Sequence, residues 1–148
     1  MKKLLGLIFL MLFLVSATEM TSPKPHAKKS LEGTWELVSY YNYDDNVITD
    51  TILANETNRQ VKMFYNHKVM WTKYVPLDTV EWFGYGSYET TEDRLRETLE
   101  FGSAAIMKIM DTLRVFELEL ILEEDIYSQI NLDAEGNRFF SENYKRID

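Results

Sequence analysis

The chain has 148 residues, a formal net charge of −8 and no cysteine. This length is typical of one domain, and the acidic charge disfavours nucleic acid and anionic lipid, because both are bound by clustered Lys and Arg. The lack of cysteine excludes disulfides, thiolate metal sites and a lipidated N-terminal cysteine, and two histidines are too few for a multi-histidine metal site. The composition therefore predicts neither a metal nor a cofactor.

Residues 1–17 have the order of a secretory signal peptide. Two lysines precede an apolar run from Leu4 to Val15, and Val15-Ser16-Ala17 supplies small residues for cleavage. A membrane anchor is the alternative, but about 12 residues of helix span about 18 Å, which is short of the roughly 30 Å hydrocarbon core. We therefore predict export to the periplasm or the exterior, without a lipid anchor and without a membrane span after cleavage.

Residues 18–30 read TEMTSPKPHAKKS, a polar stretch that contains two of the three prolines. This composition predicts a flexible tether, because it offers almost no apolar side chain to a core. The folded domain should then cover residues 31–148. A domain of about 120 residues buries about two-thirds of the surface of its unfolded chain, which is enough for one core.

From Gly33 onward the chain is rich in Tyr, Phe, Trp, Val, Ile and Thr, and apolar and polar residues alternate. This composition and this period of two are typical of strands. We predict about nine strands, spaced as in an all-β sandwich or a closed antiparallel barrel. Their expected ranges are 34–41, 59–65, 68–74, 82–90, 94–101, 105–110, 114–122, 126–132 and 138–147.

The segments 59–65 and 68–74 flank Asn66-His67, which predicts a two-residue hairpin turn. In that register Met63 faces Met70, and we assign this charge-poor set of side chains to the inner face. The opposite set consists of Lys62, Phe64, Val69, Trp71 and Lys73. It would bring two lysines inside, and each of them would need a buried partner. Burial of Trp71 would invert the assignment and make Lys62 the charged partner of a ligand.

Further along, Gly84 and Gly86 share one strand face with Tyr88, which indicates a sharp bend or the close approach of another group. Glu97 lies on an otherwise apolar face of its strand. The segment 114–122 is the clearest half-buried strand, since Phe, Leu, Leu and Leu alternate there with glutamates on the other face.

Gly33-Thr34-Trp35 resembles the G-x-W motif that opens the first strand of lipocalins and other calycins. The run GTWELVS, the glycine-rich strand at 84–88 and the closing segment Tyr144-Lys145-Arg146-Ile147 are similar to bacterial secreted lipocalin-like domains of unknown function. The resemblance covers residues 31–148. It implies an all-β, antiparallel up-and-down barrel of about eight or nine strands with a capped base and an open mouth. It also implies that Arg146 lies on the indole of Trp35 at the barrel base.

An eight-stranded barrel is wide enough to hold one small ligand, so we predict a small, mostly apolar molecule in the mouth. Methionines would adapt to its shape, and hydroxyl groups would orient a polar group on it. The predicted ligand-binding residues are Ser39, Met63, Met70, Tyr88, Leu118, Leu120 and Tyr144.

Two other classes of function remain open. A filled barrel would suit a protein-interaction or envelope accessory module, with an exposed patch of Phe64 and Trp71 between Lys62 and Lys73. A small-barrel enzyme could use Glu97 or Glu142 in proton transfer, although a structural ion pair with Arg146 is the simpler interpretation. The two histidines fall in the tether and the hairpin turn, which argues against a Ser-His-acid triad.

Overall fold

The computed structural model describes residues 29–76 and 80–148. The predicted signal peptide and most of the predicted tether, residues 1–28, lie outside the described residues. Within the described ranges the chain forms antiparallel strands and one short helix, and no helix there is long and apolar enough to cross a membrane. The predicted all-β class is therefore confirmed.

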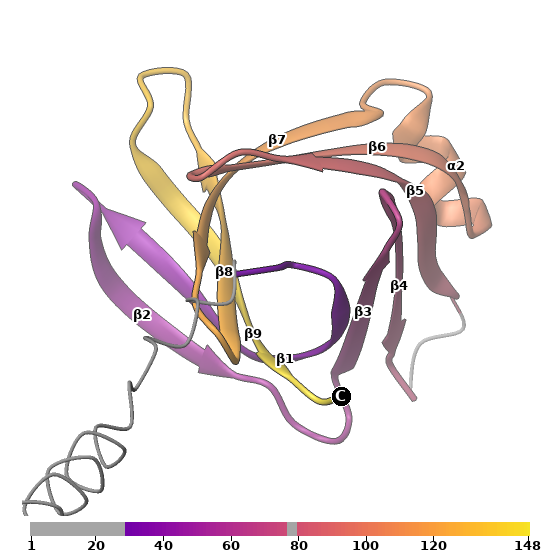
Figure 1. The fold of residues 1–148 in the computed structure, drawn as a ribbon, viewed down its shortest axis with the longest axis horizontal. Helices are drawn as coiled ribbons and strands as arrows, with labels where there is room; N and C mark the ends of the chain where they lie inside the picture. The colour runs from indigo at the N-terminus through magenta and orange to yellow at the C-terminus, as the bar shows by residue number, and fades with distance from the viewer. Residues whose placement is uncertain (1–28, 77–79) are drawn as a thin grey trace, which may run out of the picture.

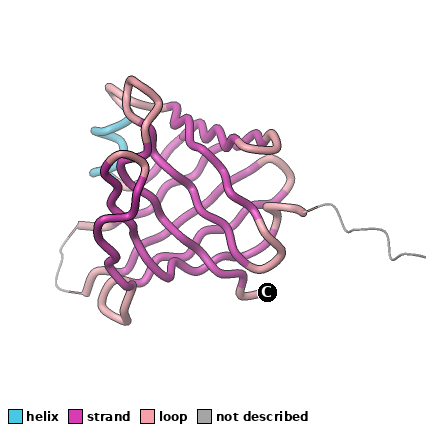
Figure 2. Tube along the Cα trace, turned by 90° about the vertical axis from the view of Figure 1, so that its left-hand side faces the viewer, coloured by secondary structure: helices cyan, strands magenta, loops and turns pink. Residues whose placement is uncertain are grey.

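Nine strands and one helix follow one another in the described part of the chain. They are β1 (Gly33–Asp44), β2 (Val47–Leu53), β3 (Arg59–Tyr65), β4 (Lys68–Tyr74), β5 (Trp82–Thr90), β6 (Arg94–Gly102), α2 (Ala104–Met110), β7 (Val115–Leu122), β8 (Ile126–Leu132) and β9 (Arg138–Arg146). Neighbouring strands are paired in the order β2-β1-β3-β4-β5-β6-β7-β8-β9, and β1 also pairs with β9. The sheet therefore closes into a ring, as Figure 1 shows, and Figure 2 shows its strands crossing the molecule obliquely.

The strand β2 pairs with the second half of β1 and extends away from the ring (Figure 1). All its residues are exposed. The turn that leads into it, Asp45-Asn46, has positive φ at both residues, and so does the turn Asn66-His67 between β3 and β4. Such two-residue turns match the twist of antiparallel strands, and the predicted hairpin at Asn66-His67 is confirmed.

Two elements differ from the sequence-based expectation. Residues 47–53 form a strand that we did not predict, and the predicted strand at 105–110 is the helix α2. Ala, Met and Lys favour a helix, and Ile106 and Met110, four positions apart, are its two buried residues. The expected number of strands agrees only because one missed strand offsets one wrong strand.

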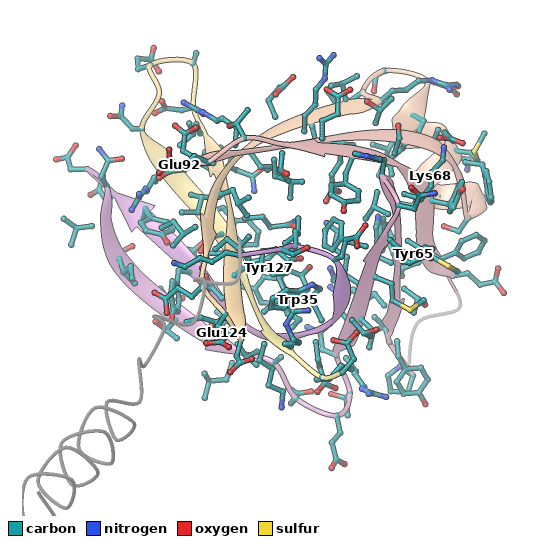
Figure 3. All side chains as sticks on the ribbon, viewed as in Figure 1. Trp35, Tyr65, Lys68, Glu92, Glu124 and Tyr127 are labelled. Carbon is teal, nitrogen blue, oxygen red and sulfur yellow. The ribbon has the colours of Figure 1, made fainter. Side chains whose placement is uncertain are left out.

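The hairpin of β3 and β4 presents the opposite face to the interior from the one predicted. Met63 and Met70 are 45% and 44% exposed, whereas Lys62 and Phe64 are 2% and 1% exposed. Figure 3 shows Tyr65, which shares the face of Met63, outside the ring. The assignment was wrong because Lys62 does have a buried partner. The interaction patch expected on the outer face is wrong for the same reason, since its four residues belong to the inward-facing set.

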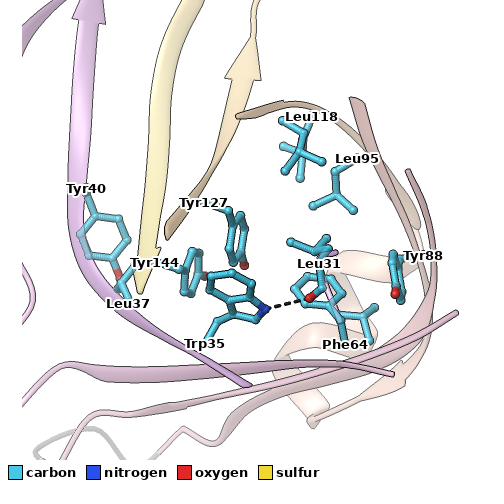
Figure 4. Close-up of a cluster of buried hydrophobic side chains, with 12 residues drawn as sticks. Leu31, Trp35, Leu37, Tyr40, Phe64, Tyr88, Leu95, Leu118, Tyr127 and Tyr144 are labelled. Carbon is cyan, nitrogen blue, oxygen red and sulfur yellow. Dashed lines mark hydrogen bonds between the residues drawn. The ribbon is translucent and has the colours of Figure 1, made fainter. Parts of the chain in front are cut away.

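One end of the ring interior is filled with aromatic and aliphatic side chains (Figure 4). Trp35 is fully buried and packs edge-to-face against Tyr127, with ring centroids 4.8 Å apart. The guanidinium carbon of Arg146 lies 4.1 Å from the centroid of the Trp35 ring, so the predicted contact between these two residues is confirmed. We call this end the base.

The segment before β1 crosses the base and is held there by hydrogen bonds. The indole Nε1 of Trp35 donates to the carbonyl oxygen of Leu31 at 2.8 Å, and Leu31 is buried in the cluster (Figure 4). Arg146 donates to the carbonyl oxygens of Ser30 and Glu32 at 2.8 and 2.7 Å. Arg146 thus joins the first and last strands of the ring to the segment that covers its base.

Candidate ligand-binding cavity

The interior contains a cavity of about 370 Å³ on the side of the ring where α2 lies. Its apolar wall comes from β4, β5, β6, β7, β9 and the helix. These residues are Trp71, Trp82, Leu99, Ile106, Ile109, Phe116, Leu118 and Phe140. Figure 1 shows α2 beside β5 and β6, and Ile106 and Met110 pack there with Leu99. The helix therefore forms part of the cavity wall.

Gly84 allows the indole of Trp71 to lie against β5. The two residues are direct partners in the β4–β5 register. A Cβ atom placed on Gly84 would lie 2.7 Å from the indole Nε1, which is too close for any side chain. The close approach that the glycine-rich strand predicted is therefore made by a tryptophan of the chain itself.

A layer of polar side chains separates the cavity from the base. Lys62 Nζ lies 2.6 Å from Glu97 Oε1 and also donates to Gln129 Oε1 at 2.8 Å. Gln129 Nε2 in turn donates to Glu142 Oε2 at 2.7 Å. A buried lysine is tolerable in an apolar interior when it has both an opposite charge and further hydrogen bonds, and Lys62 has both.

Glu142 receives its hydrogen bonds on one oxygen. The Tyr144 hydroxyl donates to Oε2 at 2.6 Å, and the amides of Gln129 and Gln60 donate to the same atom at 2.7 and 3.5 Å. Among the described residues, no hydrogen bond reaches Oε1 of this carboxylate. Glu142 lines the cavity, so this oxygen is available to a ligand.

The position of Glu142 also affects two tyrosines. Burial, together with the charge of Glu142, raises the pKa of Tyr40 to about 12. The same two causes, in the same order, raise the pKa of Tyr144 well above its ordinary value. Both hydroxyl groups therefore remain protonated at neutral pH and can donate hydrogen bonds.

Lys73 is the second cation of the cavity. Its Nζ lies 5.6 Å from the centroid of the Tyr40 ring and 3.4 Å from the Tyr40 hydroxyl. The side chain is partly buried, and no carboxylate of the described residues lies within 4.0 Å of it. Its ammonium group thus has only weak partners within the protein.

Four of the seven predicted ligand-binding residues lie inside the ring, but not together. Leu118 lines the cavity, and Tyr144 contacts its polar layer through Gln60 and Glu142. Tyr88 and Leu120 are buried, but they line a separate depression beside Lys29, where the described chain begins.

The other three predicted residues lie away from the cavity. Met63 and Met70 face outward, as described above. Ser39 is buried, but β1 has a bulge between Leu37 and Ser39, and Tyr40 rather than Ser39 is the direct partner of Glu142. Asn143 donates hydrogen bonds to the backbone oxygen and the hydroxyl of Ser39. The bulge thus changes which residues of β1 face the interior.

Most of the wall was missed by the sequence analysis. Trp71 and Lys73 had been assigned to the outer face, and the lining residues not considered at all are Gln60, Trp82, Leu99, Ile106, Ile109, Phe116, Gln129, Asn131 and Phe140. One signal could have revealed the hairpin face, because Glu97 lies on an apolar strand face and a buried carboxylate needs a buried cation. Within the described ranges, no group of three or more His, Asp and Glu side chains is placed to hold a metal ion.

Comparisons with known proteins add the fold but no activity. No protein-family model and no curated protein matches the chain. A solved structure of an uncharacterized protein from Bacteroides eggerthii is similar, with a TM-score of 0.51 and 13% sequence identity. The match covers 80% of this chain and 100% of the other. At this identity the likeness concerns the arrangement of the strands alone.

Proposed function

We propose that this chain is an exported, lipocalin-like β-barrel that binds a small, mostly apolar molecule in its mouth. The observation that carries the proposal is the cavity of about 370 Å³. Small-molecule sites are concave, have volumes of about 300–1,000 Å³ and combine apolar walls with a few convergent polar groups. Four aromatic side chains, four aliphatic ones and a polar layer give this cavity that composition.

The two ends of the ring support the lipocalin-like interpretation. Trp35 and Arg146 are in contact at the base, as the resemblance to calycins implies. The segment that precedes β1 is hydrogen-bonded to both residues there. The cavity lies beyond the polar layer, as expected for a capped barrel with an open mouth. The proposal that the protein is exported rests on the signal-peptide pattern of residues 1–17.

The competing functions have less support. The patch expected to bind a protein partner belongs to the inward-facing side of the hairpin. An enzyme would need a carboxylate free to exchange a proton, but Glu97 is paired with Lys62 at 2.6 Å. Glu142 is the remaining candidate, and its position beside an apolar wall suits binding as well as chemistry.

A first experiment asks whether the purified domain carries a ligand. The protein is extracted under denaturing conditions, and the extract is analysed by mass spectrometry. We expect a small molecule with a large apolar part. If the domain consistently carries no small molecule, a titration with an added probe decides whether the site is empty or absent.

The second experiment uses N-phenylnaphthylamine, an uncharged fluorescent probe, and two matched variants of α2. Ile109 lines the cavity and is 41% exposed, whereas Met107 does not line it and is 39% exposed. Ile109→Glu should weaken binding of the probe at least tenfold, about 1.4 kcal/mol, because it brings a charge to the apolar wall. Met107→Glu should leave binding unchanged. Equal affinity for both variants would place the probe outside this cavity.

A further inference from the structure

Four charged side chains line the cavity, two cations and two anions: Lys62, Lys73, Glu97 and Glu142. Lys62 and Glu97 lie 2.6 Å apart and neutralise each other. One ammonium group, on Lys73, and one carboxylate, on Glu142, then remain without an ionic partner among the described residues. The formal charge of the cavity lining is therefore balanced, but one cation and one anion within it stay apart.

These two groups flank the same pair of neutral side chains. Gln60 is the cross-strand partner of Lys73, and its Nε2 lies 3.5 Å from Glu142 Oε2. Tyr40 is the cross-strand partner of Glu142, and its hydroxyl lies 3.4 Å from Lys73 Nζ. The free oxygen of Glu142 and the weakly held ammonium of Lys73 thus belong to one region of the cavity.

We propose that the natural ligand is an amphiphile with no net charge, whose polar head presents a hydrogen-bond acceptor to Lys73 and a donor to Glu142. An amide head and a zwitterionic amino-acid head share this chemistry. The apolar body of the ligand packs against Trp71, Trp82 and Phe140. This inference rests on the proposed function, because it specifies the ligand of the same cavity.

The preference for a head without net charge follows from the balanced lining. A simple carboxylate would be attracted by Lys73 but would bring a second negative charge close to Glu142. A simple amine would be attracted by Glu142 but would bring a second positive charge close to Lys73. An uncompensated charge is costly where apolar side chains exclude water, so each of these heads leaves one unfavourable contact. A head with both a donor and an acceptor satisfies both groups.

The test compares four probes with the same number of carbon atoms: octanamide, α-aminooctanoic acid, octanoate and octylamine. Their affinities for the wild-type chain are measured by calorimetry at neutral pH and in competition with N-phenylnaphthylamine. At least one of the first two should bind at least tenfold more tightly than both octanoate and octylamine. The order between octanamide and α-aminooctanoic acid identifies the head group that the cavity prefers.

Two variants shift the charge balance in opposite directions. Glu142→Gln leaves Lys73 uncompensated, so octanoate should bind at least tenfold more tightly than it binds to wild type. Lys73→Gln leaves Glu142 uncompensated, so octylamine should gain by a similar factor. Lys68 lies on the outer face of β4 and pairs with Glu100 at 2.6 Å, and Lys68→Gln should change none of the four affinities. Lys73 is only partly buried, so its variant keeps the test valid even if Glu142→Gln fails to fold.

The outcomes separate this inference from the proposed function. Tightest binding of octanoate or octylamine to wild type, or the absence of the opposite shifts in folded variants, would overturn the inference and leave a ligand-binding cavity in place. If neither the four probes nor N-phenylnaphthylamine bind, the proposed function fails and the inference fails with it.

Discussion

The base and the cavity of this ring are lined by many of the same residue types, yet they differ in packing. At the base, Trp35, Phe64, Tyr127 and Tyr144 are each at most 1% exposed, and their rings contact one another. In the cavity, Trp71 and Trp82 are only partly buried and border open space. Full burial of one large apolar side chain stabilises a fold by about 1.5–3 kcal/mol. The base therefore stabilises the fold more than the cavity wall does. The cavity wall instead leaves apolar surface accessible to a ligand.

The polar layer between the two ends accounts for part of this difference. Lys62 and Glu97 are 2% and 4% exposed and form a buried ion pair across the interior. Such a pair adds little net stability compared with apolar residues of the same size, but it requires hydrogen-bond partners in fixed positions. It therefore interrupts the apolar packing of the interior on the side of β3 and β6 and places polar atoms at the edge of the cavity, whereas Leu118 of β7 continues that packing into the cavity wall.

The variant Lys62→Met should cause the largest loss in the free energy of unfolding. It leaves Glu97 buried without its cation, and the loss of one partner of a buried pair costs about 3–5 kcal/mol. The double variant Lys62→Met/Glu97→Leu should recover most of the free energy of unfolding, because both charges are gone. Urea denaturation at neutral pH measures both values. A single variant as stable as wild type would show that the ion pair is not maintained in solution.

A smaller loss is expected at the base from Arg146→Ala. This change removes the guanidinium from the Trp35 ring together with its hydrogen bonds to Ser30 and Glu32, and it should lower the free energy of unfolding by about 1–3 kcal/mol. Arg146→Lys should recover only part, because an ammonium group lacks the flat stacking face. Unchanged unfolding midpoints for both variants would contradict the closure of the base described here.

Alkaline pH should affect the interior through its tyrosines. The pKa of Tyr40 is about 12 in the folded chain against an ordinary value of 10.0, so the folded state holds this proton more tightly than the unfolded state. The stabilisation is then complete below pH 10 and is lost as the pH rises through 12. Denaturation curves across this range measure the loss, and tyrosinate absorbance follows the ionisation. Tyr40→Phe should make the free energy of unfolding fall less steeply with rising pH. An unchanged dependence on pH would exclude Tyr40 as a contributor.

The smallest effect is expected at Met70, the residue next to Trp71. Because Met70 is 44% exposed on the outer face, Met70→Glu should change the free energy of unfolding by no more than about 0.5 kcal/mol. Binding of N-phenylnaphthylamine should also stay the same. With the inward orientation expected from the sequence, Met70→Glu would bring a charge into the barrel and weaken binding about tenfold. Such a loss in a folded variant would contradict the outward orientation of Met70.

The strand pattern and the base could be predicted because local and short-range signals determine them. Alternation placed eight of the strands, and Asn66-His67 identified a hairpin whose two turn residues have positive φ. The stretch Val47–Leu53 is rich in β-branched residues, but it is exposed along its whole length and shows no inward face to detect. The helix α2 was missed because seven residues with two buried positions also fit a short strand.

The cavity could not be predicted in the same way. Which face of the β3–β4 hairpin lines it depends on a contact between distant strands. Excluding lysines from the interior is a sound rule for one hairpin, but Glu97 of β6 supplies the partner that makes Lys62 an exception. The bulge between Leu37 and Ser39 adds a second obstacle, since one extra residue exchanges the faces of β1 without any marked sequence signal. Both features become visible only when the ring is closed.

That closure also has a consequence for the order of folding. The strands β3 to β9 pair with their neighbours in sequence, whereas the pairing of β1 with β9 joins distant parts of the chain. Thr34 and Asp148, whose hydrogen bond lies beside this pairing, are 114 positions apart. Contacts of such separation form slowly, because the entropy of a long loop must be lost before any contact compensates for it. The meander of local hairpins can assemble first, but the indole of Trp35 remains uncovered by Arg146 until β9 has been synthesised and has docked against β1.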